Sequence, residues 1–338
     1  MIRIGINGFG RIGRRVFRLL HNHPELEVVA INDLADAKTL SHLLKYDSIH
    51  GVFHETISHD DNHIIINGEK ILLSHENHPK NIDWKSPKVD YVIESTGKFK
   101  TKDVLEHHIT NGAKRVILSV PSEDDSIKTI VLGINESSLD GTETIISNAS
   151  CTTNNAAPMM DVIHKLCGIK QAYITTIHSF TTDQSLHDQP HRDLRRARAA
   201  GQSIVPTTTG AAKALTRIFP ELSDVIGGCG IRVPVANGSL TDITFNVENA
   251  ASIETVNDAF KKASEGYLKN VLAYTEDPIV SIDIVGNPHS CVFDSQMTSV
   301  IGNMVKIIGW YDNETAYSQR IIDLICFLSA KKQLLSNK

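Results

Sequence analysis

The sequence lacks the features that mark membrane proteins and nucleic-acid-binding proteins. Its longest apolar runs are far shorter than the roughly 20 residues that a membrane-spanning helix needs. It has no tract of basic residues, and its net charge of -5 argues against a nucleic-acid or anionic-membrane partner. With 41% hydrophobic and 22% charged residues, the composition is that of a soluble globular protein, which excludes the disordered and collagen-like classes.

Cysteine is scarce, and its distribution argues against structural disulfides. The five cysteines are scattered, odd in number and never spaced as CxxC, which is typical of a protein kept reduced. The first residues, MIRIGINGFGRIGRR, lack the apolar core of a signal peptide. We therefore expect a cytoplasmic location. Most of the 16 histidines lie in polar runs without ligand spacing to a carboxylate or cysteine, so no metal site is expected.

Internal repeats and low-complexity linkers are also absent, and 338 residues are enough for two domains. Up to about residue 150, apolar strands alternate with helical segments, a pattern typical of βαβ units and a parallel sheet. Asn67-Gly68 interrupts this part between two apolar runs and predicts an antiparallel hairpin. After Cys151 the pattern changes, and strands of alternating pattern dominate from Ile231 to Trp310.

A glycine-rich turn follows the first predicted strand. Gly8, Gly10 and Gly13 form GxGxxG between a strand and a helix, where backbone N–H groups and the helix N-terminus can hold a pyrophosphate. The next strand ends in Asp33, twenty residues beyond Gly13, where a carboxylate can bind the adenosine ribose. The combination predicts a nicotinamide dinucleotide site, with an ordinary tight turn as the alternative.

Cys151 lies in SNASCTTN, between a strand-like run and an apolar helical stretch. Its hydroxyl and amide neighbours could be helix caps, and the cysteine could be a small buried hydrophobe or half of a disulfide. At a helix N-terminus, however, the dipole and nearby N–H groups are expected to lower the thiol pKa. His178 ends the strand ITTIHS and could point from a sheet edge into a cleft as the partner base.

These patterns predict an α/β protein with two domains. We expect an N-terminal Rossmann-type parallel sheet over residues 1–150 that binds NAD, and an α+β catalytic domain with a mostly antiparallel sheet over residues 151–314. The C-terminal segment, 315–338, contains an amphipathic helix that is expected to pack back on the NAD-binding domain. The polar stretch 181–203 is expected to be poor in helix. The strands expected in the first domain are residues 3–7, 26–32, 91–96, 115–120, 129–135 and 144–149.

The chain resembles the phosphorylating glyceraldehyde-3-phosphate dehydrogenases over nearly its full length. The motifs that carry the resemblance are INGFGRIGR, KYDSIHG, ESTG, SNASCTTN, TTIHSFTTDQ, DLRRARAA, IVPTTTGAAKA, RVPV and WYDNE. The resemblance implies an NAD-dependent enzyme of glycolysis and gluconeogenesis that acts on glyceraldehyde 3-phosphate and inorganic phosphate. It also implies a homotetramer, with residues 181–203 reaching across a subunit boundary.

The resemblance implies roles for individual residues. Cys151 would attack the aldehyde, and His178 would raise its nucleophilicity and act as general base. For the C3 phosphate of the substrate it implies Thr181, Asp183 and Arg232. For the attacking phosphate it implies Ser150, Thr152, Thr209, Gly210 and Arg196. For the cofactor it implies Arg11 and Ile12 at the pyrophosphate, Asp33 at the ribose, and Ser119, Asn313 and Tyr317 toward the nicotinamide.

Two of these assignments have open alternatives. The carboxylate of Asp183 is expected to orient a neighbour rather than to touch an anion. The arginines of RRAR could instead form a solvated or subunit-contact run.

Three features, one of them a pair of residues, depart from the family pattern. Asn155 replaces a cysteine that many relatives carry four residues after the nucleophile, which removes a disulfide partner for oxidised Cys151. Asn77 stands where an arginine near the adenine is common, and Thr315-Ala316 replace a tryptophan-glycine pair.

Two other functions compete with this interpretation. Erythrose-4-phosphate dehydrogenase shares the fold and the cysteine, but Thr181 and the run TTTGAA favour the triose enzyme. The second alternative is a catalytically weak NAD-binding or adhesion protein, against which Cys151, His178 and Arg232 argue.

Overall fold

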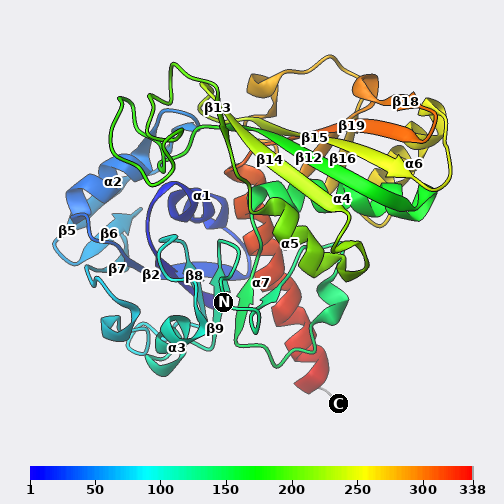
Figure 1. The fold of residues 1–338 in the computed structure, drawn as a ribbon. Helices are drawn as coiled ribbons and strands as arrows, with labels where there is room; N and C mark the ends of the chain where they lie inside the picture. The colour runs from blue at the N-terminus through cyan, green and yellow to red at the C-terminus, as the bar shows by residue number, and fades with distance from the viewer. Residues whose placement is uncertain (337–338) are drawn as a thin grey trace. The chain divides into compact units, whose positions relative to one another are not determined.

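The computed structural model describes the backbone of residues 1–336 and the side chains of residues 1–331. The chain divides into two compact units (Figure 1). The first contains Met1–Ile130, Ser137–Ala149 and Ser318–Lys338, and the second contains Val131–Glu136 and Ser150–Tyr317. Within the described residues, no helix combines the length and apolar character needed to cross a membrane.

The first unit is built on a nine-stranded sheet with the order β10-β11-β9-β8-β1-β2-β7-β6-β5. All neighbours from β10 to β7 pair in parallel, as the sequence predicts. Because β1 lies between β2 and β8, the strand order reverses at β1, which is where ligands bind at the carboxyl ends of such sheets. The strands are β1 (Ile2–Asn7), β2 (Leu26–Asn32), β5 (Ile57–Asp60), β6 (His63–Ile66), β7 (Glu69–Ser74), β8 (Tyr91–Glu94), β9 (Arg115–Leu118), β10 (Lys128–Thr129) and β11 (Ile145–Ser147).

Two local predictions within this unit have different outcomes. The hairpin at Asn67-Gly68 is confirmed, since β6 and β7 pair antiparallel and both turn residues have positive φ, 52° and 90°. The strand expected at 129–135 is wrong beyond Thr129. The N–H of Val131 bonds to the side chain of Asn135, 2.8 Å away, which folds this run into a turn.

Helices and smaller elements complete the first unit. Its helices are α1 (Arg11–Leu20), α2 (Ala37–Lys45) and α3 (Lys102–Thr110), and β3 (Tyr46–Asp47) pairs with β4 (Gly51–Val52). Helix α7 (Thr315–Ser336) belongs to this unit from Ser318 onward. The hydroxyls of Tyr91 and Ser329 lie 3.2 Å apart, so the C-terminal helix packs beside β8.

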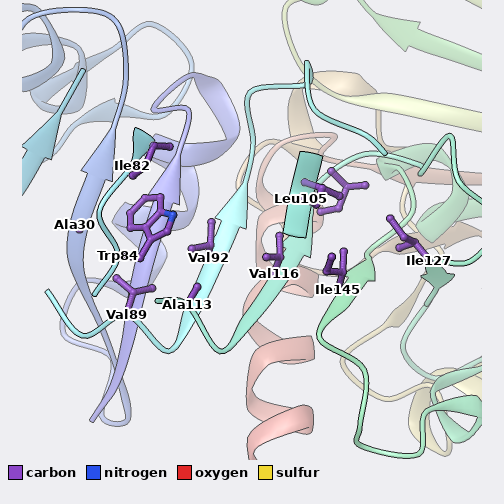
Figure 2. Close-up of a cluster of buried hydrophobic side chains, with 11 residues drawn as sticks. Ala30, Ile82, Trp84, Val89, Val92, Leu105, Ala113, Val116, Ile127 and Ile145 are labelled. Atoms are coloured by element: carbon purple, nitrogen blue, oxygen red, sulfur yellow. The ribbon is translucent and has the colours of Figure 1, made fainter. Parts of the chain in front are cut away.

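A buried apolar cluster holds α3 to this sheet, as Figure 2 shows. Val92 on β8 and Val116 on β9 are fully buried, and Leu105 on α3 packs with them. Trp84 belongs to the same cluster and is only 1% exposed. Burying a large apolar side chain contributes roughly 1.5–3 kcal/mol, so the cluster stabilises the packing of α3 on β8 and β9.

The second unit carries an eight-stranded sheet with the order β13-β14-β12-β15-β19-β17-β16, and β18 pairs with β19. Most pairs are antiparallel, as predicted, but β12 pairs in parallel with β14 and β16 with β17. The strands are β12 (Ile169–Ser179), β13 (Val205–Thr207), β14 (Ile226–Val233), β15 (Ser239–Val247), β16 (Leu272–Thr275), β17 (Cys291–Asp294), β18 (Ser299–Ile301) and β19 (Met304–Tyr311).

Three helices belong to the second unit: α4 (Cys151–Cys167), α5 (Ala211–Ile218) and α6 (Ile253–Glu265). The buried helix α4 packs against β12, β15, β17 and β19. Residues 180–204, all of them described, form neither helix nor strand, which agrees with the prediction for this stretch. The short 3-10 helices of the chain are Pro79–Asn81, Glu136–Ser138, Pro220–Leu222, Ser281–Ile284 and Ser295–Met297.

Candidate active site

Cys151 is the first residue of helix α4, as the sequence predicts. The Oγ of Ser150 caps this helix by accepting from the N–H of Thr153 at 3.1 Å. The thiol therefore lies beside the helix N-terminus, where unpaired N–H groups and the dipole favour an anion. Cys151 is partly exposed, whereas Cys167 and Cys291 are buried.

Strand register brings His178 and Arg232 to the same place. β12 and β14 run parallel, and His178 lies directly opposite Arg232 in their pairing. The Nε2 of His178 lies 3.4 Å from the Sγ of Cys151. The structure thus gathers three sequence-predicted residues from one helix start and two strands into one cluster.

Arg232 also limits where the proton of His178 can lie. Its Nη1 lies 2.5 Å from Nδ1 of His178 and 3.0 Å from the carbonyl oxygen of Ser179. A guanidinium can only donate, so in this arrangement Nδ1 accepts and the ring proton lies on Nε2, facing the sulfur. In the other tautomer Nδ1–H donates to the Ser179 oxygen, 2.7 Å away, and Nε2 is able to accept the thiol proton.

The expectation of a lowered thiol pKa is wrong. Burial raises the pKa of the Cys151 thiol, and this outweighs the opposing effects of Arg232 and of the N–H of Thr152. Burial, followed by the positive charge of Arg232, lowers the pKa of His178 to about 3. Thiol and imidazole are therefore both neutral at pH 7, so the thiol proton must be removed as the sulfur reacts.

The buried neutral imidazole predicts a pH-dependent stability. A histidine in the unfolded chain has a pKa of about 6.5, so between pH 6.5 and pH 3 the unfolded chain binds more protons than the folded one. Stability is therefore lost as the pH falls, by about 2 kcal/mol between pH 7 and pH 5 from His178 alone.

Denaturant unfolding at these two pH values measures the effect. The variant His178→Gln should lose less stability on acidification than the wild type. His59→Gln, at an exposed histidine, should lose as much as the wild type. Equal acid sensitivity of the wild type and His178→Gln would contradict the prediction.

Tyr311 is a residue of this cluster to which the sequence assigns no role. Its hydroxyl lies 2.9 Å from the Oγ1 of Thr152 and 3.0 Å from the Oγ1 of Thr176. Its ring meets that of His178 edge-on, with centroids 6.0 Å apart. Burial raises the pKa of Tyr311, so the phenol stays protonated and can donate a hydrogen bond. The motif WYDNE contains it, but only the β19 register shows which way it faces.

The residues expected to bind phosphate fall into two groups. Arg232 lies beside the cysteine, whereas Arg196 donates to the carboxylate of Asp183 at 2.6 Å. The Nε of Arg196 also donates to Thr207 Oγ1 at 2.9 Å. Asp183 thus orients Arg196. The sequence analysis expects Asp183 to orient a neighbouring side chain in this way.

The remaining phosphate candidates lie at helix and loop ends. Gly210 precedes α5 as its N-cap, and the Oγ1 of Thr209 accepts from the N–H of Ala211 at 3.2 Å. Thr181 is partly exposed in the loop after β12. Hydroxyls and N–H groups at a helix start are suited to an anion.

The glycine turn after β1 has the geometry that a dinucleotide requires. Gly8 has a φ of 91°, and a side chain there would lie 2.7 Å from the N of Thr96. A Cβ at Gly13 would lie 2.2 Å from the oxygen of Gly8, so the helix could not approach the turn with any other residue. At Gly10 a Cβ would meet nothing within 4 Å, which leaves that side of the turn open toward the pocket that it lines.

Asp33 lines the same pocket as Gly8 and Gly10, and it accepts a hydrogen bond from the backbone of the glycine turn. Its Oδ2 accepts from the N–H of Phe9 at 2.7 Å, and its Oδ1 accepts from the N–H of Ala35 at 3.0 Å. Each oxygen keeps a lone pair that could accept a further hydrogen bond. Asn77, one of the departures from the family pattern, is exposed at this pocket.

Arg11 and Ile12 open helix α1, and their side chains are partly exposed. The guanidinium of Arg11 donates to both carboxylate oxygens of Asp47, at 2.7 and 3.1 Å. This pairing and backbone N–H donors hold the pKa of Asp47 well below its usual range, against the effect of burial. Ser119 follows β9 and is 8% exposed.

Asn313 and Tyr317 are both buried in the second unit. The Oδ1 of Asn313 accepts from the hydroxyls of Ser179 and Ser239, at 2.9 and 3.0 Å. Its amide group is therefore oriented with the oxygen inward. The substituted pair Thr315-Ala316 is buried at the start of α7.

The departure at Asn155 is also buried. Its Nδ2 donates to the carbonyl oxygens of Ser290 and Trp310, at 3.2 and 3.3 Å. Among the described residues, no group of three or more histidine, cysteine, aspartate or glutamate side chains could hold a metal ion.

Comparison with known proteins places this geometry in a family. Residues 2–102 match the glyceraldehyde 3-phosphate dehydrogenase NAD-binding domain, and residues 150–313 match the C-terminal domain of that enzyme. The chain belongs to the glyceraldehyde-3-phosphate dehydrogenase family. It is therefore an NAD-dependent oxidoreductase.

Several members of the family are similar over nearly their whole length. Glyceraldehyde-3-phosphate dehydrogenase 1 of Bacillus cereus is 49% identical over 333 residues, which cover 98% of this chain and 99% of the relative. Glyceraldehyde-3-phosphate dehydrogenase 2 of Streptomyces avermitilis is 52% identical, covering 97% and 98%. The Thermotoga maritima protein is 49% identical, covering 96% and 98%.

The environment of Asp33 predicts which cofactor the chain prefers. The 2′-phosphate of NADP would bring about two negative charges against this carboxylate. The next residues, Leu34, Ala35 and Asp36, supply no compensating cation. We expect kcat/KM for NAD to exceed that for NADP by well over tenfold, or more than about 1.4 kcal/mol.

Steady-state kinetics with both cofactors test this prediction. The ratio of kcat/KM for NAD to kcat/KM for NADP should be smaller in Asp33→Gly, mainly because the affinity for NAD falls. Comparable kcat/KM values for NAD and NADP in the unmodified protein would show that Asp33 does not select the cofactor.

Proposed function

We propose that the chain oxidises glyceraldehyde 3-phosphate with NAD and inorganic phosphate to an acyl phosphate, as a glycolytic and gluconeogenic enzyme. The observation that carries the proposal is the Cys151–His178–Arg232 cluster, with Sγ 3.4 Å from Nε2. Relatives bearing this enzyme's name that are about half identical over nearly the whole chain support the choice of substrate.

In the proposed reaction, the Sγ of Cys151 forms a bond to the aldehyde carbon, while Nε2 of His178 takes the thiol proton and passes it to the aldehyde oxygen. The product is a thiohemiacetal. His178 then takes the hydroxyl proton as the carbon is oxidised to a thioester. NAD, when bound, supplies the acceptor for the hydride. A phosphate oxygen displaces the sulfur from the thioester, which releases the acyl phosphate and restores Cys151.

Two anion sites are proposed beside Cys151. For the C3 phosphate we propose Arg232, Thr181 and Asp183, with Asp183 acting through Arg196. For the attacking phosphate we propose Ser150, Thr152, Thr209, Gly210 and Arg196. Each set combines guanidinium donors with hydroxyl or backbone N–H groups, the donors that bind phosphate most strongly.

Arg232 links substrate binding to the position of the proton on the imidazole of His178. While its Nη1 donates to Nδ1, Nε2 keeps the ring proton and cannot accept another. A phosphate that draws the guanidinium away would let Nδ1–H donate to Ser179, freeing Nε2 to act as base. The proposal therefore couples the phosphate of the substrate to activation of the thiol.

For the cofactor, we propose the turn with Gly8, Gly10 and Gly13, and Arg11 and Ile12 at the pyrophosphate. Asp33 is proposed at the ribose, and Ser119, Asn313 and Tyr317 near the nicotinamide. In this proposal residues 1–150 form the NAD-binding domain, residues 151–314 the catalytic domain, and 315–338 a C-terminal helix on the NAD-binding domain. We also propose a cytoplasmic homotetramer.

One assay tests the proposal against both alternatives. NADH formation is followed by absorbance with glyceraldehyde 3-phosphate, with and without inorganic phosphate. We expect NADH formation that requires phosphate and is faster than with erythrose 4-phosphate. Faster turnover of the tetrose would identify the other dehydrogenase, and no NADH with either sugar would favour a non-catalytic protein.

A further inference from the structure

A buried carboxylate, Glu94, ends strand β8 beneath the glycine turn. Its side chain is 0% exposed, so it touches neither solvent nor the pocket. Its Oε1 accepts from the N–H and the Oγ1 of Thr96, at 2.9 and 2.5 Å. Its Oε2 accepts from the Nδ2 of Asn7 at 2.5 Å and faces the Nε2 of His108 at 3.1 Å.

The hydrogen bonds around Glu94 have a determined direction. The indole N–H of Trp84 donates to Nδ1 of His108 at 2.9 Å, and an indole cannot accept. Nδ1 is therefore unprotonated, and the ring proton lies on Nε2, facing Glu94. All four groups around the carboxyl group are thus placed to donate, two to each of its oxygens.

The same chain of bonds continues across the ends of the neighbouring strands. The Oδ1 of Asn7, at the end of β1, accepts from the Nδ2 of Asn32, at the end of β2, at 2.8 Å. The Oδ1 of Asn32 accepts from the Oγ of Ser74, at the end of β7, also at 2.8 Å. These hydrogen bonds fix the orientation of the side-chain amides of Asn7 and Asn32. The NH₂ group of Asn7 therefore points toward Glu94.

The partners of Glu94 line the dinucleotide pocket. Asn7, Asn32 and Thr96 line the pocket that Gly8, Gly10 and Asp33 also border. Between Glu94 and Thr96, the hydroxyl of Ser95 donates to the carbonyl oxygen of Gly8 at 2.7 Å. The segment Ser95-Thr96 is thus joined to the glycine turn on one side and to the buried carboxylate on the other.

We propose that Glu94 is a positioning residue for NAD, which it affects by holding Asn7 and Thr96 against the glycine turn. The inference rests on the proposed function only in requiring that the pocket binds NAD. Preorganised pocket walls spare a ligand the cost of ordering them. Loss of the carboxylate should therefore weaken NAD binding without any lost contact to NAD itself.

The variant Glu94→Gln tests this with a side chain of the same shape. Its amide NH₂ would face two of the four donors in either orientation, so one side of the network must open. We expect the Kd for NAD, measured by calorimetry, to rise at least about tenfold, and the KM for NAD to rise with it. The KM for the aldehyde should stay within about twofold of the wild type. Glu106→Gln, at an exposed glutamate on α3, is the matched control and should bind NAD normally.

A second pair of variants covers the case in which Glu94→Gln does not fold. His108→Leu removes one donor to the carboxylate, whereas the amide of His108→Gln can still donate to it. We expect the leucine variant to raise the NAD Kd and the glutamine variant to restore most of the affinity. A lowered Tm with an unchanged NAD Kd in Glu94→Gln, or in the leucine variant, would show that the network is only structural. Failure of the wild type itself to bind NAD would instead refute the proposed function.

Discussion

Replacement of Cys151 by serine is expected to lower kcat for aldehyde oxidation by at least about 10³-fold while NAD binding stays normal. A neutral imidazole can take a proton from a thiol far more readily than from an alcohol. An oxygen ester would also transfer its acyl group to phosphate more slowly than a thioester. Cys229→Ser, at another partly exposed cysteine in the same unit, is the matched control and should retain activity.

Alkylation provides a second measurement of the same site. We expect Cys151 to react first with iodoacetamide at neutral pH, because it is partly exposed and because Arg232 and the N–H of Thr152 favour its thiolate. Cys167 and Cys291 are buried, so the reagent cannot reach their thiols without local opening of the fold. Activity should fall in proportion to the fraction of Cys151 that is modified, which mass spectrometry measures. Modification of Cys167 or Cys229 first, with activity retained, would show that Cys151 is not the nucleophile.

Local sequence was sufficient to predict the dinucleotide turn and the position of Cys151. The close approach of Gly13 to the oxygen of Gly8 is a contact between near neighbours in the chain, and the strand, turn and helix follow one another directly. The start of α4 at Cys151 likewise depends on the local cap from Ser150. Such features are predictable because the interactions that create them are close in sequence.

Features that depend on strand register were predictable only by resemblance or not at all. His178 and Arg232 are 54 residues apart and meet because β12 and β14 pair in parallel, in a sheet expected to be mostly antiparallel. The Glu94 network joins the ends of four strands, and the motif ESTG alone does not indicate it.

The thiol pKa shows a different limit of sequence reasoning. The helix N-terminus and the nearby base both suggested a lowered pKa for Cys151. Burial has the opposite effect and is the larger one here, but burial depends on packing that the local sequence does not contain. The ion pair between Arg11 and Asp47 also could not be predicted from local sequence, because the two residues are 36 positions apart.

Replacement of Arg232 is expected to affect KM for a phosphorylated aldehyde and for an unphosphorylated aldehyde differently. A charge-assisted contact between guanidinium and phosphate contributes about 1.5–3 kcal/mol, so Arg232→Ala should raise the KM for glyceraldehyde 3-phosphate by about 10- to 150-fold. The KM for NAD should change little. Unphosphorylated glyceraldehyde has no phosphate to lose, so its KM should scarcely change.

The contact of Arg232 with His178 adds a separate effect on kcat. The guanidinium lowers the pKa of His178 and opposes the effect of burial on the pKa of Cys151, so its removal alters both groups. Because the phosphate of glyceraldehyde 3-phosphate is proposed to draw the guanidinium away from Nδ1, this kcat effect should be larger with unphosphorylated glyceraldehyde, whereas the KM effect should appear only with the phosphorylated aldehyde. Steady-state kinetics with the two aldehydes separate these contributions, and Arg232→Lys, which keeps a charge, should recover part of the KM effect. Equal losses of kcat/KM with both aldehydes would mean that Arg232 acts through His178 and the fold and does not bind the substrate phosphate.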